Sequence, residues 1–186
     1  MTDVMRMSGT KQQPRAYGPV ARALHWSMAV GILFAFLLGL TVDAFPRAYE
    51  NTVVQVHMIV GLALLVLLAL RLVSRLITGA PAPEAGGSPL LEKLAGAGHL
   101  GLYALMLVVP IAGLATIFLR GRGIDLGLFT IASPIEANRA LGRSAKEVHE
   151  LLSFALIGLA ALHAAAAVFH HVVLRDGTMR RMMPQR

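Results

Sequence analysis

Four long apolar stretches alternate with short polar segments along the 186-residue chain. The apolar stretches run approximately over residues 24–42, 53–72, 100–119 and 148–174. A helix needs about 20 residues to cross the hydrocarbon core of a bilayer, so each stretch is long enough to span a membrane. The pattern predicts an all-α integral membrane protein whose four helices form a bundle. We expect a polar cytoplasmic tail over residues 1–16, followed by one membrane domain over residues 17–186.

The Lys and Arg residues are distributed unequally between the two ends of the predicted helices. Eleven of the 17 lie in the terminal segments, at the end of the second stretch and in the connection to the third: Arg6, Lys11, Arg15, Arg22, Arg71, Arg75, Lys93, Arg175, Arg180, Arg181 and Arg186. Loops rich in Lys and Arg stay on the cytoplasmic side of a membrane. We therefore expect both termini to be cytoplasmic. The cations behind the net charge of +7 are spread along the ends of the predicted membrane helices. We therefore expect membrane lipid as a partner and no nucleic acid.

Composition narrows the choice of cofactor. Hydrophobic residues make up 56% of the chain and charged residues only 15%, which is typical of a membrane protein. The chain has no cysteine. Disulfides, thiolate metal sites, iron–sulfur clusters and covalently attached c-type haem are thereby excluded. Any cofactor must be held by histidine or by non-covalent packing.

Four histidines are spaced so that they form two pairs at different depths. His149 and His163 lie fourteen residues apart in the fourth stretch, which places them on nearly one helix face and about 21 Å apart. His57 begins the second stretch at the depth of His149, and His25 begins the first at the depth of His163. The spacing predicts two non-covalent haem b groups with axial pairs His57/His149 near the outer face and His25/His163 near the cytoplasmic face.

The same fourteen-residue step connects other residues with these sites. Arg71 follows His57 by fourteen residues, so it would face the inner haem, where a guanidinium can pair with a propionate. Gly39 follows His25 by fourteen residues and would expose bare backbone at the level of the outer haem, and Gly61 would leave room beside His57.

Two further histidines lie near the cytoplasmic face. His170 is seven residues after His163 on nearly the same helix face, and a substrate-binding or proton-handling role competes with simple placement at the membrane interface. His99 begins the third stretch and is a candidate contact for a quinone or a propionate, again with an interfacial position as the alternative.

Four segments together resemble the bacterial cytochrome b561 family. These are "ARALHWSMAVGI", "VQVHMIVGLALLVLLALRLVSRL", "GHLGLYALMLVVPIAGL" and "VHELLSFALIGLAALHAAAAVFHH", and the resemblance extends from about residue 17 to the C-terminus. It implies a four-helix cytochrome of the bacterial inner membrane with two haems b, in which the positions of His25, His57, His149 and His163 are axial ligands. In family members that oxidise superoxide and reduce ubiquinone, the position matching His170 lies by the quinone.

The connection between the third and fourth stretches gathers five cations, among which Arg120 and Lys146 lie nearest the ends of the two helices. A cationic funnel there would attract a small anion such as superoxide toward the outer haem. The alternative is a solvated loop whose cations are balanced by nearby carboxylates.

Three functions remain open at this point. The first is a superoxide:ubiquinone oxidoreductase. The second is a cytochrome b subunit that links a partner dehydrogenase or hydrogenase to the quinone pool. The third is a small transporter or proton channel that uses the histidines as a relay and binds no haem.

Overall fold

The computed structural model describes residues 16–79, 81 and 88–183. Within these residues the chain forms four long helices, two short strands and three short helical turns: α1 (Pro19–Thr41), η1 (Val42–Ala44), α2 (Arg47–Thr78), α3 (Pro89–Leu119), β1 (Ile124–Asp125), β2 (Thr130–Ile131), α4 (Arg139–Phe169), η2 (His170–Leu174) and η3 (Arg180–Met182). The predicted polar tail lies outside the described residues except for residue 16.

Each helix begins or ends at a residue suited to that position. Proline occupies the first turn of α1 and of α3, where its missing N–H has no intrahelical partner to lose. The side chain of Asn138 caps α4 by accepting a hydrogen bond from the Leu141 amide at 3.1 Å. At its other end, α2 stops at Gly79, whose positive φ of 72° favours glycine.

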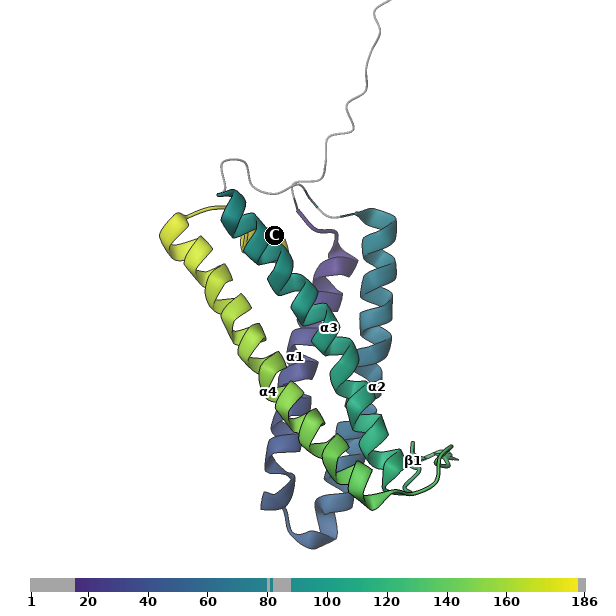
Figure 1. Ribbon diagram of the computed structural model, residues 1–186. Helices are drawn as coiled ribbons and strands as arrows, with labels where there is room; N and C mark the ends of the chain where they lie inside the picture. Colours follow the sequence, from purple (N-terminus) through teal and green to yellow (C-terminus); the bar gives the residue numbers. More distant parts are fainter. Residues whose placement is uncertain (1–15, 80, 82–87, 184–186) are drawn as a thin grey trace, which may run out of the picture.

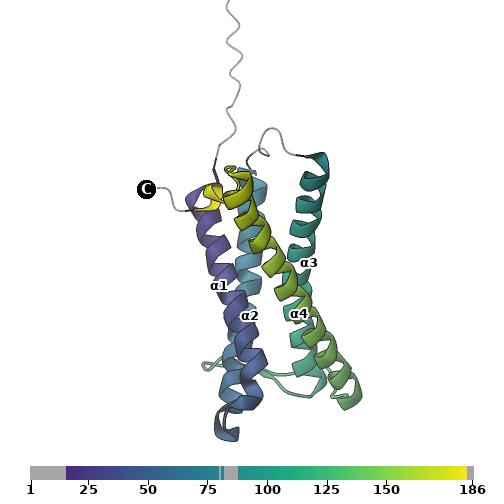
Figure 2. The ribbon, with the colours of Figure 1, turned by 90° about the vertical axis from the view of Figure 1, so that its left-hand side faces the viewer.

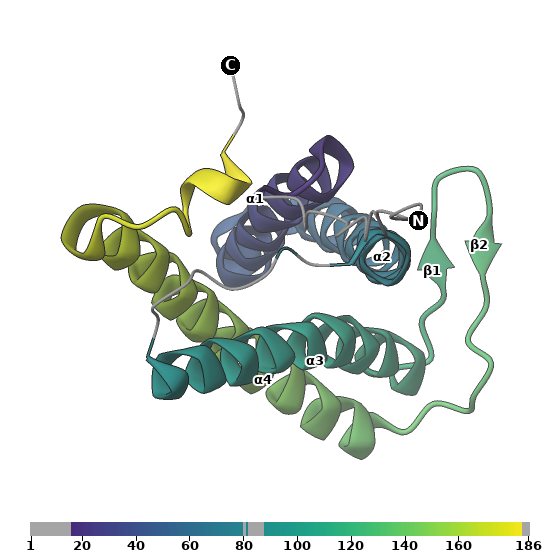
Figure 3. The same ribbon diagram turned by 90° about the horizontal axis from the view of Figure 1, so that it is seen from above.

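The four helices are arranged as two pairs. α1 packs along α2 and α3 packs along α4, whereas α1 and α4 share few contacts (Figures 1 and 2). Seen from above, the two pairs face each other (Figure 3). A small core of Met28, Ala35, Leu64 and Leu68 holds α1 against α2. The space between the pairs is where a cofactor would be bound.

All four helices are long and apolar enough to cross a membrane: Pro19–Ala44, Arg47–Thr78, Pro89–Leu119 and Arg139–Leu174. The predicted all-α, four-span fold is therefore confirmed. The helices extend beyond most of the predicted stretches, because the apolar pattern marks only the part that lies in hydrocarbon, while the polar ends continue the same helix.

The connections define two ends of the bundle. We call the end with the α1–α2 turn and the α3–α4 connection the outer end, and the end where α1 and α3 begin and α2 and α4 end the inner end (Figure 1). At the outer end β1 and β2 form a small antiparallel hairpin, with Ile124 opposite Ile131. At the inner end the chain leaves α4 through η2, a π-helical turn, and then through Arg175 in the left-handed conformation.

Candidate haem sites

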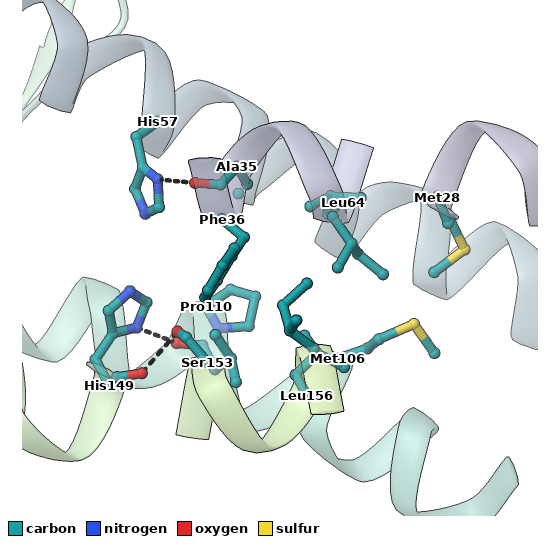
Figure 4. A pocket seen from close by; sticks show the side chains of 14 residues that line it. Met28, Ala35, Phe36, His57, Leu64, Met106, Pro110, His149, Ser153 and Leu156 are labelled. Carbon is teal, nitrogen blue, oxygen red and sulfur yellow. Dashed lines mark hydrogen bonds between the residues drawn. The ribbon is translucent and has the colours of Figure 1, made fainter. Parts of the chain in front are cut away.

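The outer histidine pair consists of His57 from α2 and His149 from α4, which face each other across a cavity between the helix pairs (Figure 4). Their ring centres are 5.9 Å apart, and their ring planes are inclined by 87°. Bonds between metals and imidazoles are about 2.0–2.1 Å long, so two imidazoles on opposite sides of one ion have ring centres about 6 Å apart. The pair has the spacing that coordination of one iron by both rings requires.

The cavity beside this pair has a volume of about 70 Å³ and is partly open to the outside. Apart from the two histidines and Ser153, its walls are mainly apolar side chains, which include Met28, Phe36, Leu64, Met106, Pro110 and Leu156. Gly61 also lines it, and a Cβ atom at that position would meet nothing within 4 Å. Two facing imidazoles among apolar walls, with no carboxylate in the lining, are the chemical surroundings that suit an apolar macrocycle with a central iron.

One ring nitrogen of each outer histidine is bound to a backbone carbonyl of the neighbouring helix. His57 Nδ1 lies 2.9 Å from the Ala35 oxygen on α1, and His149 Nδ1 lies 2.9 Å from the Val109 oxygen on α3. A carbonyl can only accept, so Nδ1 carries the proton in both rings and Nε2 keeps its lone pair. In metal-binding histidines, the ring nitrogen that does not bind the metal usually donates such a hydrogen bond, which fixes the tautomer and the orientation of the ring.

A glycine lies one helical turn after each of these carbonyls. Gly39 follows Ala35 by four residues, and Gly113 follows Val109 by four. Cβ atoms built there would lie 3.2 Å from His57 Cε1 and 3.1 Å from His149 Cε1, respectively. Since a helical side chain leans back over the preceding turn, a larger residue would cover the carbonyl that the ring needs.

Gly39 therefore does lie at the level of the outer pair, as its fourteen-residue step predicts. Its observed contact is the His57 ring, which approaches the bare backbone of α1. Gly113 takes the equivalent position beside His149. The sequence alone does not mark it, because the four-residue offset from a carbonyl becomes meaningful only once the partner helix is known.

The inner histidine pair consists of His25 from α1 and His163 from α4. Their ring centres are 6.2 Å apart, with the planes inclined by 74°. This spacing also suits a shared iron. The structure thus brings together both pairs that the sequence predicts, one at each depth, and their roles as axial ligands remain predictions. Within the described residues, no carbonyl contact like those of the outer pair is found for either inner ring.

His99 lies closer to this inner pair than the sequence suggests. Its ring centre is 5.3 Å from that of His163, with the planes inclined by 64°. Two imidazoles, His25 and His99, therefore flank His163 from different helices. His99 lies at the start of the third apolar stretch and His25 at the start of the first, so the sequence puts both at one depth, and this is the signal that could have predicted the contact. Trp26 completes the inner cluster, with its ring centre 5.5 Å from that of His25.

Arg71 connects α2 with both neighbouring helices at the inner end. Its Nε donates to the Tyr103 hydroxyl on α3 at 3.0 Å, and its Nη1 donates to the Ala21 carbonyl on α1 at 3.3 Å. Arg71 is close enough to His25 and His163 to act on both electrostatically. A guanidinium at this place can bind an anionic group of a cofactor at the inner site, as predicted for a propionate.

His170 is paired with a residue that the sequence reasoning missed. Its Nδ1 lies 2.5 Å from Asp176 Oδ2, and the other Asp176 oxygen accepts the Thr178 amide at 2.9 Å. Burial tends to raise the pKa of this carboxyl, but the hydrogen bonds from His170 and Thr178 outweigh it and lower the pKa to about 2. Asp176 is therefore an ionised acceptor at neutral pH. It holds one ring nitrogen of His170 and leaves Nε2 available.

The C-terminal segment crosses from α4 to the start of α1. The Met182 carbonyl accepts from Trp26 Nε1 at 2.9 Å, and the Met183 carbonyl accepts from Arg22 Nη1 at 2.8 Å. The Tyr17 amide donates to the Arg181 carbonyl at 3.3 Å. The loop that carries Asp176 is thus fixed at both ends beside the inner histidines.

The two cations predicted for an anion funnel differ in their surroundings. Lys146 forms an ion pair with Glu150 at 2.6 Å on the surface of α4. Arg120 has no carboxylate within ion-pair distance among the described residues, and its Cγ packs where a Cβ on Gly142 would be, at 3.0 Å. Neither side chain lines the cavity beside the outer histidine pair.

Comparison with known proteins agrees with this arrangement. Residues 16–185 match the family described as prokaryotic cytochrome b561. A relative named probable superoxide oxidase CybB, from Yersinia pestis, is 32% identical, and the match covers 92% of this chain and 98% of that protein. Cytochrome b562 of Cereibacter sphaeroides is 33% identical, covering 94% and 99%. Cytochrome b561 homolog 2 of Escherichia coli is 29% identical, covering 91% and 92%.

The family match covers nearly the whole chain and includes all four helices that carry the histidine pairs. Membership implies haem b, which agrees with the apolar cavity and the facing imidazoles, and it disfavours a transporter without haem. This chain belongs to the prokaryotic cytochrome b561 family and is a membrane-embedded b-type cytochrome that carries electrons.

Proposed function

We propose that this cytochrome binds two haems b and transfers electrons across the inner membrane from superoxide to ubiquinone. The observation that carries the proposal is the presence of two histidine pairs with ring centres 5.9 and 6.2 Å apart, one at each end of the bundle. Two cofactor sites at different depths suit electron transfer through the membrane, because a single site would not span its thickness. A relative named probable superoxide oxidase supports the choice of donor.

The overall reaction balances as follows. Two superoxide ions each lose one electron and become O₂, while ubiquinone gains two electrons and two protons and becomes ubiquinol. Haem b supplies a metal centre that accepts and releases one electron at a time. The protein must hold the two centres at fixed places, adjust their potentials and provide the protons.

His57 and His149 would hold the outer haem through Nε2. Their Nδ1 hydrogen bonds to Ala35 and Val109 increase the basicity of the ligating nitrogens, which favours the ferric state and lowers the potential. At the inner end His25 and His163 would hold the second haem. Arg71 would bind a propionate there and neutralise its charge.

His170 is the proposed hydrogen-bond partner of the quinone. Asp176 accepts from Nδ1–H, so Nε2 is the nitrogen left for the quinone, and it donates to a quinone oxygen when the imidazole carries a second proton. His99 could contact the quinone or a propionate from the other side of His163. With both termini at the cytoplasmic side, as the charge distribution predicts, the protons would come from the cytoplasm.

Arg120 and Lys146 are the proposed residues that attract superoxide to the outer end. The absence of a carboxylate partner near Arg120 in the described chain leaves its charge available for a passing anion. Because Lys146 shares its charge with Glu150, we expect Arg120 to contribute more.

The experiment is a visible spectrum of the purified protein during enzymatic generation of superoxide, followed by addition of ubiquinone, with superoxide dismutase as the control. The proposal predicts haem reduction that dismutase abolishes and that ubiquinone reverses. If the haem bands do not respond to superoxide but are reduced by a co-purifying dehydrogenase or hydrogenase, the chain is instead the electron-transfer subunit of that enzyme.

A further inference from the structure

The hairpin between α3 and α4 carries an exposed apolar tip. Leu128 is 95% exposed, the highest value among the large hydrophobic residues of the described chain, and Phe129 beside it is 59% exposed. The ten residues 126–135 contain no charged side chain. A contiguous apolar tip of this kind in water would be unfavourable, so it indicates a contact with another apolar phase.

The tip is held in a fixed conformation. The Asp125 carboxylate accepts from the Gly127 amide at 2.8 Å, and the Leu126 amide donates to the Phe129 carbonyl at 3.0 Å. Gly127 has a positive φ of 82°, which lets the chain reverse there. Since the turn is closed by its own hydrogen bonds, the two apolar side chains are presented outward together.

The hairpin lies beside the bundle and at the depth of its apolar surface. It projects sideways past α2 (Figure 3), and in Figure 1 it lies nearer the middle of the bundle than the α1–α2 turn does. Gln55 Nε2 donates to the Asp125 carbonyl at 3.3 Å. Gln55 lies two residues, or about 3 Å, inside the apolar stretch of α2 that begins at residue 53.

We propose that Leu128 and Phe129 insert into the lipid leaflet at the outer end, so that the hairpin is an interfacial membrane anchor. Apolar side chains of interfacial segments are buried about 5–10 Å into the boundary between headgroups and acyl chains. The sideways position and the depth of Gln55 place the tip at that boundary. Arg122 precedes the hairpin in the same connection, where anionic headgroups would attract it.

The anchor would fix the position of the whole α3–α4 connection. Ile124 is buried at the base of the hairpin, and β1 is bound to α2 two residues before His57. With its base on the bundle and its tip in lipid, the connection keeps a fixed position beside the outer histidine pair. This inference depends on the position of the hairpin and not on which electron donor the protein uses.

The test uses the absence of cysteine from the native chain. A Leu128→Cys variant carries a single thiol for an environment-sensitive NBD label, and Phe129→Cys is a second reporter. Glu136→Cys, exposed and charged in the same loop, is the matched control. Each labelled protein is reconstituted into phosphatidylcholine–phosphatidylglycerol vesicles with and without lipids that carry a doxyl quencher near the top of the acyl chain. An unchanged haem spectrum shows that each variant is folded.

The anchor predicts that labels at 128 and 129 emit at shorter wavelength than the label at 136 and are quenched several-fold more strongly by the doxyl lipid. Haem quenching reduces all intensities but cancels in the ratio with and without doxyl lipid. Equal quenching at 128 and 136 would show that the tip lies in water. Emission at shorter wavelength without quenching by the doxyl lipid, increasing with protein density, would show that a second copy covers the tip. Either result would overturn the proposal.

Discussion

Replacing Gly113 by alanine is predicted to raise the potential of the outer haem alone. The new Cβ atom would lie 3.1 Å from His149 Cε1 and 3.2 Å from His149 Nδ1, which is closer than nearly all native contacts of a Cβ atom. The ring must move away by a few tenths of an ångström. That movement lengthens the 2.9 Å hydrogen bond from Nδ1 to the Val109 carbonyl, because the imidazole ring and the new methyl group compete for the same space beside that carbonyl.

The size of the effect follows from the strength of that hydrogen bond. A hydrogen bond of this kind contributes about 0.5–1.5 kcal/mol net. For a one-electron couple, 1.4 kcal/mol corresponds to about 59 mV. If the bond favours the ferric state and is lost completely, the potential rises by roughly 40 mV for 1 kcal/mol, and a weakened bond gives a smaller rise.

The assay is a spectroelectrochemical titration of the purified protein, fitted with two one-electron components. Only one component should move in Gly113→Ala, and its position should rise. Gly158→Ala is the matched control, since it adds the same methyl group to α4 where a Cβ atom meets nothing within 4 Å. If Gly113→Ala leaves both potentials unchanged, or shifts them no more than Gly158→Ala does, the glycine does not control the hydrogen bond of His149.

Four further predictions address the remaining sites. His25→Gln should remove the inner haem, whereas His99→Gln should retain two haems per chain; haem analysis giving the reverse result would assign His99 as the ligand. Asp176→Asn should slow quinone reduction roughly tenfold or more while leaving reduction by superoxide intact, because a charged hydrogen bond to His170 is lost; stopped-flow traces of both half-reactions check this, and equal slowing of both would contradict it. Because the pKa of Asp176 is lowered from 3.8 to about 2, the carboxylate should stabilise the C-terminal segment fully above the unfolded pKa and lose this effect as the pH falls toward 2; amide protection factors, taken relative to the unfolded chain, that are equal above the unfolded pKa and near pH 2 would refute it. Arg120→Gln combined with Lys146→Gln should lower the rate of haem reduction by superoxide and flatten its salt dependence; an unchanged rate would show that these cations do not attract superoxide.

The fold and the histidine pairs could be predicted from the sequence because both depend on local regularities. The length of each apolar stretch predicts a membrane span, and the fourteen-residue step from His149 to His163 sets two depths on one helix face. Pairing each of these with a histidine on another helix then needs only the direction in which the helices run. The ion pair of Lys146 with Glu150 also lies at a spacing of four residues and could have been foreseen.

The remaining features depend on how the helices pack, which no periodicity in one chain segment determines. Nothing in the sequence around Ala35 or Val109 shows that a histidine from another helix reaches its carbonyl. The approach of His99 to His163 likewise requires α3 to pack against α4 at the inner end. Asp176 meets His170 only because the chain reverses at Arg175 in the left-handed conformation. The strands β1 and β2 have two residues each, too few to give a recognisable alternation.

The central claim is that four histidines bind two haems b in two separate sites. The most direct measurement is the haem b content per chain of the purified protein and of two variants, His57→Ala and His163→Ala. We predict two haems in the native protein and one in each variant, with the two variants retaining haems of different potential. A single haem in the native protein, or the same residual haem in both variants, would contradict the assignment of the two histidine pairs.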